Sequence, residues 1–127
     1  MITKPLNVNR MTGYIYEHLE VFPEGMASVV LTKEVLERFQ ATDQLASLVV
    51  SVPGTVEGIL AWSMYVEQED ETFRVHLRSK APTVNDIAQE FGGGGHTLAC
   101  GIPSVTKSQI LEVDAKLKEA VRNFKKN

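Results

Sequence analysis

The segment from Ile59 to Val66 constrains the fold more than any other part of this chain. It reads Ile-Leu-Ala-Trp-Ser-Met-Tyr-Val and is nearly all apolar. A short run of this kind is typical of a β-strand that is buried on both faces, because a strand with one wet face alternates between apolar and polar residues. Such a strand needs other elements packed above and below it. We therefore expect a central sheet with helices covering it.

Helical and strand patterns alternate along the chain, which indicates the α/β or α+β class. Helices are expected over residues 11–19, 33–39, 44–50, 84–91 and 108–124. Further strands are expected over residues 26–31, 73–80 and 102–105, and the strand over 73–80 should pair with the apolar strand as a hairpin. We predict an α/β fold in a single domain, with a central mixed β-sheet flanked by helices and a long C-terminal helix. Residues 1–10 are expected to be a lead-in or linker, and residues 11–127 the domain.

The composition excludes several classes of protein. The 127 residues carry a net charge of −3 at pH 7, so this is not a strongly basic nucleic-acid binder, and contact with a polyanion has to come from a local patch. The single cysteine, Cys100, rules out an internal disulfide and fits a reducing compartment. We expect it to be packed rather than catalytic. No apolar run approaches the ~18 residues that span a bilayer, and the N-terminus has no apolar signal core. We expect a cytoplasmic protein without a membrane partner.

Four consecutive glycines, Gly92 to Gly95, precede His96. Backbone without side chains can adopt positive φ angles and approach a ligand closely. Successive N–H groups in such a turn form a concavity that holds an anion such as phosphate, and a histidine beside it adds a hydrogen-bond donor. Taken alone, the run is explained more simply as a flexible loop. Its surroundings are what favour phosphate or nucleotide binding.

Basic residues alternate with apolar ones from Phe73 to Lys80. On a strand this pattern separates an apolar face from a basic face. The basic face comprises Arg74, His76, Arg78 and Lys80. Neighbours on one face lie about 6.5–7 Å apart, a spacing similar to that of phosphates along an extended nucleic-acid strand. A half-exposed strand whose cations offset the acidic turn at 67–71 explains the pattern equally well. If the helix over 84–91 packs on the sheet, the basic face and the glycine run share one cleft.

The remaining chemistry-bearing residues form no site that the sequence reveals. No pair of histidines, carboxylates or cysteines has metal-site spacing, and no nucleophile stands beside a base. The scattered aspartates are each explained by a cap, a turn or the surface: Asp43, Asp70, Asp86 and Asp114. The chain therefore has residues that can bind a phosphate and none that can cleave one. We expect no catalytic residue and no bound metal within it.

Two segments resemble a known family. Gly93 to Gly101 reads Gly-Gly-Gly-His-Thr-Leu-Ala-Cys-Gly and is similar to the Gly-Gly-Gly-His-x-x-Ala-x-Gly motif of the DHH-associated domain, the C-terminal domain of DHH-family phosphoesterases. The segment Leu77 to Lys80, Leu-Arg-Ser-Lys, resembles the segment that precedes this motif in the family. The resemblance covers roughly residues 11–124. Its departure within the motif is Cys100, where alanine is usual.

Within that family, the chain most resembles the bifunctional oligoribonucleases and 3′-phosphoadenosine 5′-phosphate phosphatases, which degrade very short RNAs. The resemblance implies a manganese site in a separate N-terminal DHH domain. The Asp-His-His motif of that domain is absent from this chain. It also implies a C-terminal domain that grips short single-stranded RNA or a nucleotide phosphate across an interdomain cleft. The residues so implied are Arg78, Ser79, Gly94, Gly95 and His96. To these we add Gly93 from the glycine run and Arg74, His76 and Lys80 from the basic face.

Several alternatives stay open. This chain by itself is expected to be inactive, as part of a hydrolase. The domain could instead belong to a cyclic dinucleotide phosphodiesterase, which carries a similar module, or be a stand-alone module that binds nucleotides without catalysis. His96 has two alternative roles, in contact with phosphate or close to the metals of the DHH domain. A homodimer is also left open.

Overall fold

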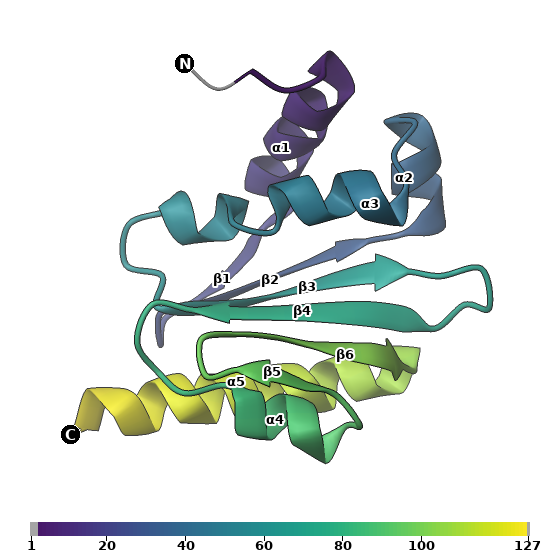
Figure 1. Cartoon of the computed structure of the whole chain (residues 1–127). Helices are drawn as coiled ribbons and strands as arrows, with labels where there is room; N and C mark the ends of the chain where they lie inside the picture. Colours follow the sequence, from purple (N-terminus) through teal and green to yellow (C-terminus); the bar gives the residue numbers. More distant parts are fainter. Residues whose placement is uncertain (1–2, 127) are drawn as a thin grey trace.

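Six strands form one mixed sheet within residues 3–126, which are the residues that the computed structural model describes (Figure 1). The strands are β1 (Glu20–Phe22), β2 (Met26–Leu31), β3 (Ala61–Glu67), β4 (Phe73–Ser79), β5 (Gly94–His96) and β6 (Ala99–Val105). Their spatial order is β1-β2-β3-β4-β6-β5. The pair β2–β3 is parallel and the other neighbours are antiparallel. The mixed sheet and the β3–β4 hairpin are as predicted.

Different helices cover the two faces of the sheet (Figure 1). The α-helices are α1 (Leu6–His18), α2 (Lys33–Arg38), α3 (Asp43–Ala46), α4 (Asn85–Glu90) and α5 (Lys107–Lys126), and two short 3₁₀ turns, Ser47–Val49 and Val52–Thr55, follow α3. Helices α1 to α3 lie on one face, and α4 and α5 lie on the other. The predicted α/β class and long C-terminal helix are confirmed. Within residues 3–126, no helix is long and apolar enough to cross a bilayer.

The central strand β3 joins two hydrophobic cores. Every residue from Ala61 to Val66 is buried, which confirms a strand covered on both sides. Because side chains alternate along a strand, Met64 packs with α1 and the segment after α2, whereas Tyr65 packs with α4 and α5. The apolar run therefore places β3 at the centre of the sheet, with helices packed against both of its faces.

The first helix begins earlier than expected. The lead-in predicted over residues 1–10 is helical from Leu6 onward, and residues 1 and 2 lie outside the described part of the chain. Val8, Met11 and Ile15 are all buried in one core. Their helical spacing extends the amphipathic pattern one turn further toward the N-terminus than the prediction allowed.

Two further elements differ from the prediction. The expected helix over residues 44–50 is α3 followed by a 3₁₀ turn, and it begins one residue earlier because Thr42 Oγ1 accepts a hydrogen bond from the Leu45 N–H at 3.3 Å. The glycine run was expected to be a turn. Only Phe91 and Gly92 form one, and Gly94 to His96 form the edge strand β5, which pairs with β6.

Asp114 is buried, which corrects its assignment to the surface. It lies on α5 against β3 and is 6% exposed. Its Oδ1 accepts hydrogen bonds from Ser63 Oγ at 2.7 Å and from the Tyr65 hydroxyl at 2.6 Å. Ser63 Oγ also lies 3.0 Å from Ser28 Oγ on β2. These side chains form a polar network that ties the long helix to the centre of the sheet.

Candidate functional site

One face of the sheet is left open over β4, β6 and β5. Residues that pair across antiparallel strands share a face. Register places Met64 of β3 beside His76 of β4, and His76 beside Gly101 of β6, which in turn pairs with Gly94 of β5. Because Met64 faces the core formed with α1, His76, Gly101 and Gly94 lie on that same face, beyond the edge of the helical layer.

His76, Gly101 and Gly94 form one row across the strands of the open face, and a second row runs beside it. Arg78 of β4 pairs with Ala99 of β6, and Ala99 pairs with His96 of β5. With adjacent strands about 4.8 Å apart, Arg78 and His96 start from backbone positions about 10 Å apart on one surface. In this register Ala99 is the residue that stands between them on β6. This row brings two cationic or proton-binding groups to the same open face.

The open face is hollowed into a groove of about 510 Å³. Its lining includes Arg74 and His76 from β4, Gly92, Gly93 and Gly94 from the glycine run, and Gly101 and Pro103 from β6. The structure thus brings the basic face and the glycine run together, as the sequence suggested. Gly101 and Pro103 were not among the predicted residues. Gly101 is the last residue of the quoted Gly93–Gly101 motif, which was the available signal for it, whereas the strand pattern of 102–105 gave no reason to select Pro103.

His76 lines this groove and is half-buried. Burial lowers the pKa of its imidazole below the ordinary 6.5, the charges of Arg78 and Arg74 lower it further, and Asp43 opposes the shift. His76 is therefore mostly neutral at pH 7 in the structure. A neutral imidazole beside two guanidinium groups offers one donor and one acceptor to a ligand.

Arg78 is held in place by backbone carbonyls. Its Nη1 donates to the carbonyl oxygen of Leu77 at 3.0 Å and to that of Cys100 at 3.2 Å. Partial burial lowers the pKa of the guanidinium, which stays charged at any physiological pH. These contacts fix the side chain across β6, toward the strand that carries the glycines. A preorganised arginine with remaining N–H groups can bind phosphate without first losing side-chain freedom.

The glycines of the run have different structural roles. A Cβ atom at Gly93 would overlap the carbonyl oxygen of Gly101, and one at Gly95 would lie 2.8 Å from Cys100 Cα. Gly95 also has a φ of +138°, which side chains disfavour. The fold therefore requires both residues to be glycine. At Gly94, by contrast, a Cβ would meet no atom within 4 Å, although this residue lines the groove.

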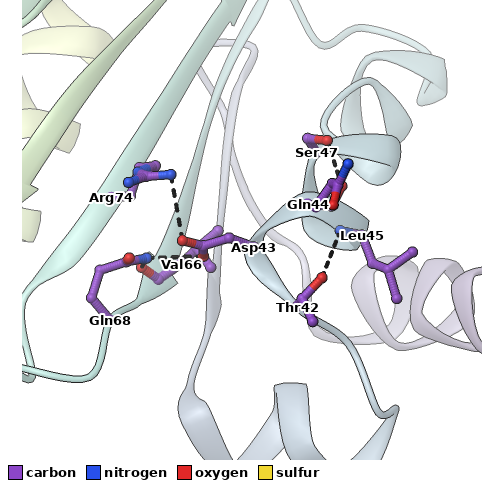
Figure 2. Close-up of polar contacts among 8 residues, drawn as sticks. All are labelled: Thr42, Asp43, Gln44, Leu45, Ser47, Val66, Gln68 and Arg74. Atoms are coloured by element: carbon purple, nitrogen blue, oxygen red, sulfur yellow. Dashed lines mark hydrogen bonds and ion pairs between the residues drawn. The ribbon is translucent and has the colours of Figure 1, made fainter.

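Of the predicted site residues, Arg78, Ser79, Lys80, Gly95 and His96 do not line the groove itself. Because side chains alternate along a strand, Ser79 points to the opposite face of the sheet from Arg78. Its hydroxyl donates to the Leu60 carbonyl at 3.4 Å and accepts from the Ala81 N–H at 3.2 Å. Lys80 is exposed and follows the end of β4. Arg74 lines the groove, but its Nη1 lies 3.4 Å from Asp43 Oδ2 (Figure 2). His96 is exposed on β5.

The described residues provide binding groups and no metal centre. Within residues 3–126, no group of three or more His, Cys, Asp or Glu side chains is placed to hold a metal ion. Cys100 is buried, its Sγ donates to the Val84 carbonyl at 3.6 Å, and burial raises the pKa of its thiol. It is packed, as predicted. The chemistry available at the groove is therefore recognition of an anion by arginine, histidine and exposed backbone.

Comparison with known proteins identifies relatives along most of the chain. A family model described as the DHHA1 domain matches residues 26–123. A probable bifunctional oligoribonuclease and PAP phosphatase NrnA of Streptococcus mutans is 34% identical over 118 residues, which are 93% of this chain and 38% of that protein. The bifunctional oligoribonuclease and PAP phosphatase NrnA of Bacillus subtilis is 42% identical over 96 residues, or 76% of this chain and 30% of that protein. The chain thus spans less than two fifths of these relatives.

Solved structures share the fold at low sequence identity. An exopolyphosphatase-related protein from Bacteroides fragilis aligns with a TM-score of 0.84 and 24% identity, covering 98% of this chain and 38% of that one. A pGpG-specific phosphodiesterase, PggH from Vibrio cholerae, aligns with a TM-score of 0.66 and 13% identity, covering 93% of this chain and 40% of that one. These similarities support the α/β architecture.

Proposed function

Because this chain belongs to the DHHA1 domain family, we propose that it is the substrate-binding domain of a phosphoesterase that hydrolyses short RNA oligonucleotides and 3′-phosphoadenosine 5′-phosphate. The observation that carries the proposal is the open face, on which the groove brings the glycine run beside Arg74 and His76, and on which Arg78 follows His76 along β4, in an otherwise acidic chain. Relatives named as bifunctional oligoribonuclease and PAP phosphatase supply the substrate class. The buried Cys100 thiol suits a reducing, cytoplasmic setting.

The rest of the machinery is proposed to lie in an N-terminal DHH domain of the same protein. There, manganese would supply an activated water for attack on phosphorus. In this domain, Arg78 and His96 would bind the phosphates or the terminal nucleotide of the substrate. Gly94, which has no side chain, would let the nucleic acid lie close to the sheet. Holding the charged backbone in one orientation lowers the entropic part of the barrier. The open face of β4, β6 and β5 would form one wall of the interdomain cleft.

Replacing Arg78 by alanine in the full-length enzyme should lower kcat/KM on a diadenylate by at least about tenfold, which corresponds to about 1.4 kcal/mol of transition-state stabilisation. Steady-state kinetics on the dinucleotide measures this loss. The matched control is Arg122→Ala, which removes an arginine from α5 on the other face of the sheet and should leave the kinetics unchanged. Equal kcat/KM for the wild type and Arg78→Ala would contradict the proposal.

Substrate comparison separates the proposed function from its alternatives. The full-length protein should hydrolyse a linear dinucleotide faster than a cyclic dinucleotide or a longer single-stranded DNA. Preference for the cyclic substrate would instead identify a cyclic dinucleotide phosphodiesterase. Nucleotide binding without hydrolysis, in the presence of Mn²⁺, would identify a binding module without catalysis.

The pKa of His76 should lie below 6.5 in the free protein, because burial and the neighbouring cations disfavour its charged form. Because its pKa is lower in the folded than in the unfolded state, its contribution to stability is fully present above pH 6.5 and is lost as the pH falls from there through the folded-state pKa. A bound phosphate favours the imidazolium, so adenosine 5′-monophosphate should raise the pKa. Proton NMR titration, with assignment by His76→Gln, measures both values. An unchanged pKa on saturation would place the phosphate away from His76.

A further inference from the structure

The basic face ends in an ion pair at its β3–β4 turn. Asp43 Oδ2 lies 3.4 Å from Arg74 Nη1, with 48% of the arginine and 40% of the aspartate side chain exposed. Asp43 Oδ1 accepts a hydrogen bond from Gln68 Nε2 at 3.0 Å (Figure 2). The same Gln68 nitrogen donates to the Val66 carbonyl at 3.0 Å. The aspartate therefore has two side-chain partners from the β3–β4 hairpin.

Asp43 reaches the open face from the first residue of α3. Thr42 caps that helix through the Leu45 N–H, which sets the backbone position of Asp43. Gln68, the residue that follows β3, binds its carboxylate from the other side. Its charge also reaches His76, whose pKa it raises against the stronger opposing effects. Asp43 is thus an acidic group directed at a row of basic ones.

Beyond Arg74, the charge of the surface side chains changes from positive to negative. A second hollow, of about 310 Å³, adjoins Asp43, and its lining carries a net negative charge because Glu37, Asp43, Glu67 and Glu69 outnumber the one cation, Lys33. The opposite end of β4 carries Arg78, and His96 lies in the same cross-strand row on β5. A negatively charged strand laid along β4 meets favourable charge at the Arg78 end and unfavourable charge at the Asp43 end.

Resting on the proposed function, we propose that Asp43 limits the length of single-stranded nucleic acid that this groove binds. Arg78, His76 and Arg74 follow one another along β4 at intervals of about 6.6 Å, so each faces a successive position of an extended strand. Asp43 neutralises Arg74 and removes the cation from the last of these positions. The acidic hollow then repels the phosphates of a longer strand. Short oligonucleotides gain all the favourable contacts that the groove offers.

Asp43→Asn in the full-length protein is the direct test, with binding of oligoadenylates of two and six nucleotides followed by fluorescence anisotropy at several salt concentrations. The hexanucleotide should bind at least about threefold more tightly than to the wild type. The slope of log K against log salt should steepen by about 0.7, as expected for one more phosphate contact on a single strand. Binding of the dinucleotide should not change.

Three variants control this experiment. Glu112→Gln makes the same change of charge on α5, on the opposite face of the sheet, and should change neither affinity. Asp43→Glu retains the charge and should behave as the wild type. The double variant Asp43→Asn/Arg74→Gln removes the released cation as well, and should return the hexanucleotide to wild-type affinity.

The outcomes separate this proposal from the proposed function. An unchanged hexanucleotide slope in Asp43→Asn, or an equal gain for both lengths, overturns the length limit. If the wild type binds oligonucleotides but hydrolyses none of them, the proposed function fails while the length limit is still decided by binding. A wild type that binds neither length overturns both.

Discussion

Replacing Asp114 by alanine is expected to lower the melting temperature by about 10 °C or more. The carboxylate accepts hydrogen bonds from Ser63 and Tyr65 in the interior, and a hydrogen bond to a charged group contributes about 1.5–3 kcal/mol. Losing both bonds should cost about 3 kcal/mol, which a domain of this size shows as a shift of several degrees per kcal/mol. Thermal unfolding followed by circular dichroism measures the change.

Two variants show whether the network or the helix itself is responsible. Glu112→Ala removes an exposed carboxylate from the same helix, so its melting temperature should match that of the wild type. Tyr65→Phe removes only one donor and should produce a smaller loss, and its combination with Asp114→Ala should cost less than the sum of the two. A wild-type melting temperature for Asp114→Ala would show that the buried carboxylate does not stabilise the fold.

The network around Asp114 shows where pattern-based prediction fails. A carboxylate on a long amphipathic helix is normally assigned to the solvent. Asp114, however, lies beside Val113 and precedes Leu117 by three residues and Val121 by seven, on the buried stripe of α5. The helical spacing therefore indicated burial. What it could not indicate was the partner, because Ser63 and Tyr65 are brought beneath the helix only by the packing of α5 on β3.

The strands that carry an apolar pattern were predictable, and those without one were not. β3 and the inward side of β4 follow the burial imposed by two layers of helices. β1 is three residues long and mostly exposed, so it leaves no periodic pattern. β5 consists largely of glycine, a residue that is depleted in strands. Its pairing comes from the close approach of Gly93 and Gly95 to β6, which is a tertiary contact.

For the candidate site, alternation along β4 was enough to predict that Arg74, His76 and Arg78 share a face. The pairing order of β4, β6 and β5 then places the glycine strand on that face, which no local pattern encodes. Asp43 was explained as a helix cap because only its local neighbours were visible in sequence. Its carboxylate instead binds Arg74 and Gln68 from the next hairpin, while Thr42 makes the cap.

Gly94→Val should weaken dinucleotide binding by the full-length protein at least about tenfold while leaving its melting temperature nearly unchanged. The fold does not require glycine here, since a Cβ would meet no atom within 4 Å and the φ angle lies outside the positive range. Valine is also favoured in strands. Its side chain would project into the groove beside His76 and Gly101, where the proposed substrate backbone passes. Binding isotherms and thermal unfolding of the same samples measure the two effects.

Gly93→Ala is the matched comparison, because the added methyl group would overlap the carbonyl of Gly101 on β6. This variant should lose stability whether or not ligand is present. If Gly94→Val also lowers the melting temperature strongly, both glycines serve the fold. If it alters neither stability nor binding, the substrate does not cross Gly94, and Arg78 and His96 must bind it from outside the groove. Only stable protein with impaired binding assigns to Gly94 the role of leaving room for a ligand.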